Sequence, residues 1–361
     1  MKNILLLIFI IISVIFAAKK YSSHDAGGGG AGSIVSPYTL QELFDNRATG
    51  DSLIIMNTGV YAITTQIDFD AAGPAGTKAA PIEIYAGDAS GNIYGGSGTV
   101  TLMADASISA ILYFAQDFDS YCYFYDIIFD GNDSSDYCIN TEAADYHSGH
   151  MYMRCRFTNS KSHGIYGYVR GSTSQPWVFL DCEIDSCGGY GYTSPTVNRA
   201  NVEFYNCSIH NNTSGGAIIS VALDESISNI ENNRFYKNGG NDLAIYGEGG
   251  YVLSGNIFYG STGSGVYIPG STPVFNLVIN NIFHSCGAYG FNTNSADKDQ
   301  FVFMDYNCFY NNTTAAIDIL SGTPPGTHNK TSDPHFVSTT AGSEDFHLQA
   351  GSACIDSGYG Y

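Results

Sequence analysis

Three aspartates lie close together in the segment DGNDSSD, at Asp130, Asp133 and Asp136. Calcium binds oxygen ligands, and carboxylates at short spacing in a turn supply them well. The segment departs from the helix–loop–helix calcium loop because no glutamate follows at the closing position. Aspartate, asparagine and serine also favour turns that hold no metal. Two interpretations therefore stay open, a Ca2+ site and a plain turn.

A second group of residues has the chemistry of an acid–base catalyst, namely Lys161, His163 and Arg170. Elimination from a uronate needs a base that removes the proton next to the carboxyl group, while a cation neutralises that carboxyl. Lys161 is the first candidate for the base. Two further arginines have a simpler role, because they align with acidic residues on neighbouring strands. The pairs are Arg154 with Asp126 and Asp181, and Arg156 with Glu183.

A third feature is a series of rings that recurs at one outward-facing position of a repeat. After Thr158 and Asp185, five successive members carry a ring: His210, Tyr236, Tyr259, His284 and Tyr310. Flat rings with apolar faces suit the apolar faces of sugars, which favours a substrate-binding platform for a glycan. Tyrosine also packs well on any sheet surface, which is the alternative.

The elements that position these residues follow from a repeat of 23 to 27 residues between Met151 and Tyr310. Apolar and polar residues alternate within each repeat, which is typical of a strand. A fixed period of this length indicates a solenoid, so we predict an all-β, single-stranded parallel β-helix of roughly ten to twelve coils. Each repeat has an anchor, an inward Cys or Asn two residues before an inward Phe or Ile. The anchors are Cys155/Phe157, Cys182/Ile184, Cys207/Ile209, Asn233/Phe235, Asn256/Phe258, Asn281/Phe283 and Asn307/Phe309.

The anchors predict stacked columns inside the solenoid. The four asparagines are expected to form a ladder in which each amide bonds the next, and the Phe and Ile residues an apolar spine. Cys155, Cys182 and Cys207 share the asparagine position. Parallel side chains fit the geometry of a disulfide poorly, so we expect buried free thiols there.

The N-terminus has the form of a secretory signal peptide over residues 1–18, with a charged Lys2, an apolar stretch from Ile4 to Phe16 and small residues at Ala17 and Ala18. An uncleaved anchor is the alternative, although the stretch is shorter than the roughly 20 residues that span a membrane. We expect a Gly-rich linker over 19–37, a β-helix domain over 38–361, and a short capping helix within 39–47. The protein is thus expected outside the cell or at its surface, without membrane contact after cleavage.

The composition is strongly acidic, with 34 Asp and Glu against 14 Lys and Arg. Nucleic acids call for basic patches, so this balance argues against them as partners. An acidic polysaccharide stays compatible if a metal ion or a local basic cluster lies at the binding site.

Several segments resemble a known family. GDSLIIMNTGVY (residues 50–61) and APIEIYAG (80–87) are similar to the opening coils of right-handed parallel β-helix proteins of the pectate-lyase superfamily. The tail, with SDPHF at 332–336 and DFHLQAGSACIDSG at 345–358, is similar to the ending of many secreted bacterial members. The resemblance implies a right-handed β-helix and extracellular polysaccharide as the partner.

Fold alone does not fix function, so two hypotheses are carried forward. The first is a pectate-lyase-like enzyme that cleaves an acidic glycan by metal-assisted β-elimination. The second is a non-catalytic protein that binds glycans or serves as an adhesive or structural surface protein. Hydrolysis is set aside, because the paired carboxylates that flank a glycosidic bond are missing from the expected motifs.

Overall fold

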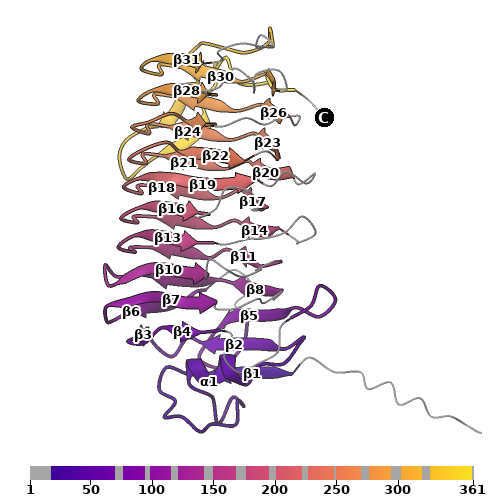
Figure 1. Ribbon diagram of the computed structural model, residues 1–361, viewed down its shortest axis with the longest axis vertical. Helices are drawn as coiled ribbons and strands as arrows, with labels where there is room; N and C mark the ends of the chain where they lie inside the picture. Colours follow the sequence, from indigo (N-terminus) through magenta and orange to yellow (C-terminus); the bar gives the residue numbers. More distant parts are fainter. Residues whose placement is uncertain are drawn as a thin grey trace, which may run out of the picture.

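The computed structural model describes residues 18–69, 76–93, 98–114, 121–141, 149–167, 176–194, 201–221, 227–247, 249–269, 276–293, 302–318 and 326–359. The chain winds into a parallel β-solenoid, an elongated stack whose strands follow one another from the N-terminal to the C-terminal end (Figure 1). The predicted all-β solenoid fold is therefore confirmed. Within the described residues, no helix is long and apolar enough to cross a membrane.

Three parallel sheets form the walls of the solenoid. The first sheet contains β1 (Lys19–Ser22), β2 (Ser52–Met56), β5 (Ile82–Gly87), β8 (Cys122–Tyr125), β11 (Met151–Met153), β14 (Trp177–Leu180), β17 (Val202–Tyr205), β20 (Ile227–Glu231), β23 (Gly250–Ser254), β26 (Asn276–Ile279) and β29 (Val302–Asp305). The second sheet contains β4 (Ile67–Asp68), β7 (Ile108–Phe114), β10 (Ser135–Thr141), β13 (His163–Tyr166), β16 (Tyr190–Thr193), β19 (Gly215–Val221), β22 (Leu243–Gly247), β25 (Val266–Tyr267), β28 (Tyr289–Asn292) and β31 (Ala315–Asp318). The third sheet contains β3 (Tyr61–Ile63), β6 (Val100–Ala104), β9 (Ile127–Asp130), β12 (Arg156–Thr158), β15 (Glu183–Asp185), β18 (Ser208–His210), β21 (Arg234–Tyr236), β24 (Ile257–Tyr259), β27 (Ile282–His284) and β30 (Cys308–Tyr310).

The short strands of the third sheet, mostly three residues long, are bounded by residues with left-handed backbone angles. Asn206 precedes β18 with φ 54°, and Asn211 follows it with φ 55°. Asparagine tolerates this region better than most residues, which explains why asparagines cluster around the anchors. The two bends hold the third sheet at a fixed place in every coil, so its outward side chains form straight columns.

The interior columns match the prediction. Asn233, Asn256, Asn281 and Asn307 each donate a side-chain amide proton to the next asparagine, at 3.0 to 3.2 Å, and the last acceptor is Asn329. Phe258 stacks on Phe283 at 4.9 Å between ring centres, and Phe283 on Phe309 at 4.7 Å. The sequence prediction missed the final rung at Asn329, because it lies beyond the last regular anchor.

The cysteines at the anchors continue the asparagine column toward the N-terminal end of the solenoid. Cys182 and Cys207 donate S–H to the carbonyls of Tyr152 and Phe179, at 3.3 and 3.4 Å. Asn233 makes the equivalent bond to the Phe204 carbonyl. All nine cysteines lie in the described part of the chain, and none of them forms a disulfide there. The free thiols predicted at the cysteine anchors are thus found.

The N-terminal segments differ in part from the expected linker. Lys19–Ser22 forms β1, which pairs in parallel with β2 at the edge of the first sheet, because its alternating side chains continue the sheet pattern. Helix α1 spans Leu40–Asp45, with a capping box between Thr39 and Glu42 and with Leu40, Leu43 and Phe44 buried. Residues 1–17, which carry most of the expected signal peptide, lie outside the described residues.

The C-terminal tail folds back along the solenoid rather than extending beyond it. Its two strands, β32 (Phe336–Ser338) and β33 (Asp345–Leu348), pair antiparallel. In Figure 1 this yellow segment runs beside β24, where Phe336 and Phe346 contact Tyr259. We call residues 336–348 the tail hairpin. It covers part of the outer face of the third sheet.

Candidate functional site

The three aspartates of DGNDSSD do not form a cluster of metal-ligand atoms. Asp130, at the end of β9, accepts hydrogen bonds from the Asn132 amide at 2.9 Å and from the Asn159 side chain at 3.0 Å, while Asp133 and Asp136 are exposed. Among the described residues, the metal-type groupings with three ligand atoms within 4.8 Å of one another do not include this set. The Ca2+ role of these aspartates stays a prediction without support from their geometry.

Lys161 and His163 lie on the coil next to DGNDSSD, as the repeat predicts. The Lys161 backbone amide donates to the Ser135 carbonyl, and Lys161 Nζ lies 3.4 Å from Ser107 Oγ. His163 is on β13 in the second sheet, where its Nδ1 accepts from the Tyr190 amide at 3.0 Å. Burial lowers the pKa of His163, so this ring is neutral at neutral pH. Arg170 lies outside the described residues.

The predicted ring column exists, but the tail hairpin packs on its middle. His210 stacks on Tyr236 at 4.3 Å between ring centres, and His284 stacks on Tyr310 at 5.2 Å. Tyr259 stacks on His284 at 5.1 Å. The ring centre of Phe346 lies 5.2 Å from that of Tyr236 and 5.4 Å from that of Tyr259. The ring centre of Phe336 lies 5.7 Å from that of His284. The middle rings therefore bind the chain's own tail, and sugar binding by the column stays a prediction.

This packing yields the first testable prediction. Replacing Tyr259 with alanine removes ring contacts to Phe336 and Phe346, which together are worth about 2 kcal/mol, so amide hydrogen exchange within residues 336–348 is expected to rise roughly thirtyfold. Mass spectrometry of exchanged peptides measures this. Tyr246→Ala, on the outer face of β22, is the matched control and should leave the tail hairpin unchanged. Equal exchange in both variants would show that the rings do not hold the tail.

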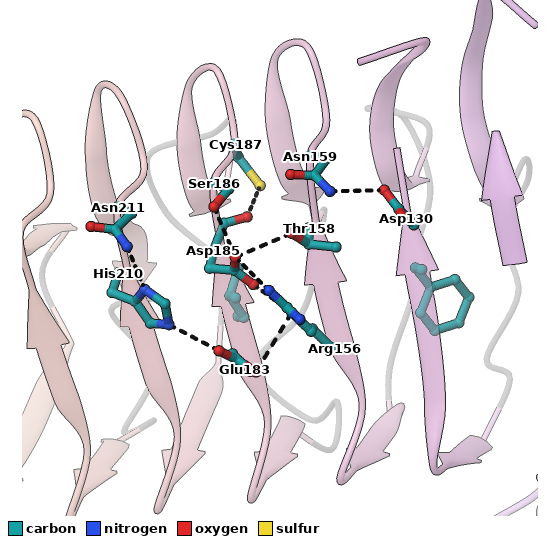
Figure 2. A network of polar contacts seen from close by, with 12 residues as sticks. Asp130, Arg156, Thr158, Asn159, Glu183, Asp185, Ser186, Cys187, His210 and Asn211 are labelled. Atoms are coloured by element: carbon teal, nitrogen blue, oxygen red, sulfur yellow. Dashed lines mark hydrogen bonds and ion pairs between the residues drawn. The ribbon is translucent and has the colours of Figure 1, made fainter. Parts of the chain in front are cut away.

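A polar network occupies the part of the third sheet that the tail hairpin leaves open. Figure 2 shows Arg156, Glu183, Asp185 and His210 pointing toward one another from β12, β15 and β18. Arg156 binds Asp185 through two parallel bonds, Nε to Oδ1 at 2.8 Å and Nη2 to Oδ2 at 2.9 Å. Glu183 Oε2 lies 3.5 Å from Arg156 Nε, and Glu183 Oε1 lies 3.0 Å from His210 Nε2. We call these four residues the polar network.

The members of the polar network differ in exposure. The Asp185 side chain is 3% exposed and also accepts from Thr158 at 3.1 Å and from Ser186 at 2.8 Å. Both of its oxygens therefore have partners, and both bind Arg156. The side chains of Arg156 and Glu183 are each 42% exposed, so these two groups can meet a ligand.

The charges of the polar network are fixed by their contacts. Burial raises the pKa of Asp185, but the Arg156 guanidinium outweighs it and the pKa ends below its ordinary value. The hydrogen bond from His210 lowers the pKa of Glu183, and the charge of Arg156 lowers it further. The bond to Asp185 raises the pKa of Arg156. At neutral pH the network thus presents one carboxylate and one guanidinium side by side.

The network has the donor atoms of a metal site. Glu183, Asp185 and His210 have ligand atoms within 4.8 Å of one another. Calcium prefers six to eight oxygen ligands, whereas this set offers two carboxylates and an imidazole. The Arg156 guanidinium already occupies both oxygens of Asp185. As arranged, the site fits a charged ligand bound by Arg156 better than it fits Ca2+.

Half of the polar network was predicted from the sequence. The predicted pair of Arg156 and Glu183 lies close together, but Arg156 binds more closely to Asp185, which was not predicted as its partner. His210 was predicted in the ring column without its partner Glu183. The signal was available, because Thr158, Asp185 and His210 follow successive anchors at the same position, beside the column of Arg156 and Glu183.

Comparisons with known proteins agree with this architecture. A family profile described as "Right handed beta helix region" matches residues 146–298 and 219–343, which together cover more than half of the chain. Among solved structures, the pectate lyase Pel9A is similar at 16% identity and a TM-score of 0.66, covering 95% of this chain and 92% of that one. Curated protein sequences gave no match.

Two further solved structures show lower similarity. One is the A-module of the Azotobacter vinelandii mannuronan C-5 epimerase AlgE6, at 14% identity and a TM-score of 0.43, covering 79% of this chain and 91% of that one. The other is tailspike protein 3 of bacteriophage CBA120, at 16% identity and a TM-score of 0.47, covering 83% of this chain and 50% of that one.

Proposed function

The chain belongs to the right-handed β-helix family, and from this premise we propose that it binds an acidic extracellular polysaccharide and cleaves it by β-elimination. The observation that carries the proposal is the polar network on the open face of the third sheet. The near full-length likeness to a pectate lyase supports the same reaction class. Secretion, which the sequence pattern of residues 1–18 predicts, is part of the proposal.

The proposed roles follow from exposure and charge. Arg156, held by Asp185, binds the carboxylate of a uronate and stabilises the negative charge that develops on it. Glu183, the exposed carboxylate beside it, accepts the proton next to that carboxyl group. The glycosidic C–O bond then breaks, which leaves a double bond in one new chain end, and the departing oxygen takes a proton from water. His210 is a positioning residue, because its bond to Glu183 orients that carboxylate.

Neighbouring residues extend this surface along the third sheet. Arg234 is exposed on β21, in the same column as Arg156 and Glu183. Coils repeat at about 4.8 Å along the solenoid axis, so charged groups in this column can contact successive parts of an extended chain. Two arginines three coils apart in one column of an otherwise acidic protein suit an extended acidic glycan.

A second function is favoured by one observation. Arg156, Glu183 and Asp185 all have partners within the polar network, which is the arrangement expected if they only stabilise the sheet surface. A non-catalytic glycan-binding protein would need these side chains only to bind the glycan, without a free catalytic group. In that case the protein is retained by a polysaccharide but releases no product.

The test is incubation of the full chain with pectate, alginate and chondroitin, with added calcium and with a chelator. We expect ultraviolet absorbance from unsaturated uronate on one of these substrates. The chelator arm tests the Ca2+ dependence predicted from DGNDSSD, and an activity that survives chelation would favour Arg156 as the neutralising cation. Retention on an affinity gel without product would support the binding function and would contradict the lyase.

A further inference from the structure

Two cysteines border one cavity where the tail packs against β30, the last strand of the third sheet. Cys308 is the first residue of β30, and Cys354 lies in the tail beyond β33. Both line one cavity of about 290 Å³, together with Lys330 and Leu348. The two segments are thus held against each other by the fold, although 45 residues lie between the two cysteines in the sequence.

The two thiols border the same cavity, and each of them shifts the pKa of the other. Cys308 Sγ also lies 3.2 Å from the Ser332 carbonyl oxygen, which fixes the orientation of that thiol. Cys354 is the one cysteine of the nine that is not fully buried, so a small reagent can reach it.

The environment of Cys354 favours its reactive form. The hydrogen bond from Cys308 lowers the pKa of Cys354, and the charge of Lys330 lowers it further. A thiolate is the nucleophile in disulfide exchange. The stacked interior cysteines are the opposite case, because burial raises the pKa of Cys155 and Cys182 well above the ordinary value.

We propose that Cys308 and Cys354 are a redox pair that forms a disulfide and locks the tail onto the end of the solenoid. The Cys354 thiolate attacks a small disulfide such as oxidised glutathione, which gives a mixed disulfide and releases one thiol. Cys308 then loses its proton, attacks the Cys354 sulfur and displaces the second thiol. The two protein thiols lose two electrons and two protons, and the oxidant gains them.

The position of this bond gives it a structural consequence. It closes a loop that contains the whole tail hairpin, and the tail hairpin covers Tyr236, Tyr259 and His284. Closing a loop restricts the detached states of the tail, so the disulfide favours the docked arrangement. In an oxidising compartment the middle of the ring column stays covered. Under reducing conditions the tail is released more easily.

The experiment uses the purified full chain, first reduced and then equilibrated with oxidised glutathione. Free thiols are alkylated in denaturant, and the unreduced digest is analysed by mass spectrometry. We expect one cross-linked peptide joining Cys308 to Cys354, and two fewer free thiols than in the reduced protein. Nine alkylated cysteines, glutathione retained on Cys354, or a cross-link between other cysteines would overturn the proposal.

A second measurement tests the lock itself. Hydrogen exchange in residues 336–348 should be slower in the oxidised protein than in the reduced one, and Cys354→Ser should remove this difference. Cys187→Ser, which alters a buried cysteine elsewhere, should keep both the cross-link and the difference. A cross-link that leaves exchange in the tail hairpin unchanged would refute the lock, because the bond would then be formed without restraining the tail.

Discussion

Replacing Asn256 with alanine is expected to lower the free energy of unfolding by about 3–5 kcal/mol, because it leaves several buried polar groups without partners. Asn256 is completely buried, and its Oδ1 accepts from both the backbone and the side chain of Asn233. Its Nδ2 donates to the Ile230 carbonyl and to Asn281 Oδ1 at 3.0 Å. Equilibrium unfolding in urea measures the loss.

The control for this prediction lies one coil earlier. Asn229 points outward from β20 and donates one partly exposed hydrogen bond to Glu203 at 2.9 Å. Asn229→Ala should cost less than about 1 kcal/mol, because water replaces that partner. If the two alanine variants unfold at the same urea concentration, the ladder does not stabilise the solenoid.

A large effect on the pH dependence of stability is expected from Asp242, a completely buried carboxyl in the turn before β22. Its Oδ1 accepts from Asn238 Nδ2 at 2.8 Å, and among the described residues its Oδ2 has no hydrogen-bond partner. Burial raises the pKa of Asp242 well above its ordinary value, although contacts with Asn238 and Ser261 offset part of the rise. The folded protein therefore keeps a proton that the unfolded chain loses near pH 4.

The sign of the pH dependence follows from this difference. Because the carboxyl pKa is raised in the folded state, the free energy of unfolding of the parent falls as the pH rises from about 4 toward the folded-state pKa. Asp242→Asn removes the titration, so the variant should gain stability over the parent by up to about 1.4 kcal/mol per pH unit in that window. Urea unfolding at several pH values measures the gain. The exposed Asp136→Asn is the control, and a constant difference between Asp242→Asn and the parent would contradict the account.

The sequence predicted the interior of the solenoid better than its surface. An inward column repeats with the coil, so Cys155, Asn256 and Phe283 were identified by spacing alone and are found in the stacks expected of them. The same spacing placed Lys161 one coil after DGNDSSD. These predictions succeeded because each depends only on neighbouring coils.

Contacts that are not periodic could not be found in this way. The tail hairpin packs Phe336 and Phe346 onto rings up to 110 residues earlier in the chain, and no repeat links the two segments. The bond from Arg156 to Asp185 is diagonal between columns rather than directly across, so alignment of the coils pointed to Glu183 instead. Outward residues are also constrained less by packing, which weakens any pattern in the sequence.

The role of Glu183 as the base is tested by the rate of unsaturated uronate formation by the parent, Glu183→Gln and Glu203→Gln. Glu203 lies on the outer face of the first sheet, so its variant makes the same chemical change away from the polar network. Loss of a general base lowers the rate by roughly 10²–10⁴-fold. We expect such a loss for Glu183→Gln and parental activity for Glu203→Gln. Equal rates in all three proteins, or no product from the parent on any uronate, would contradict this role.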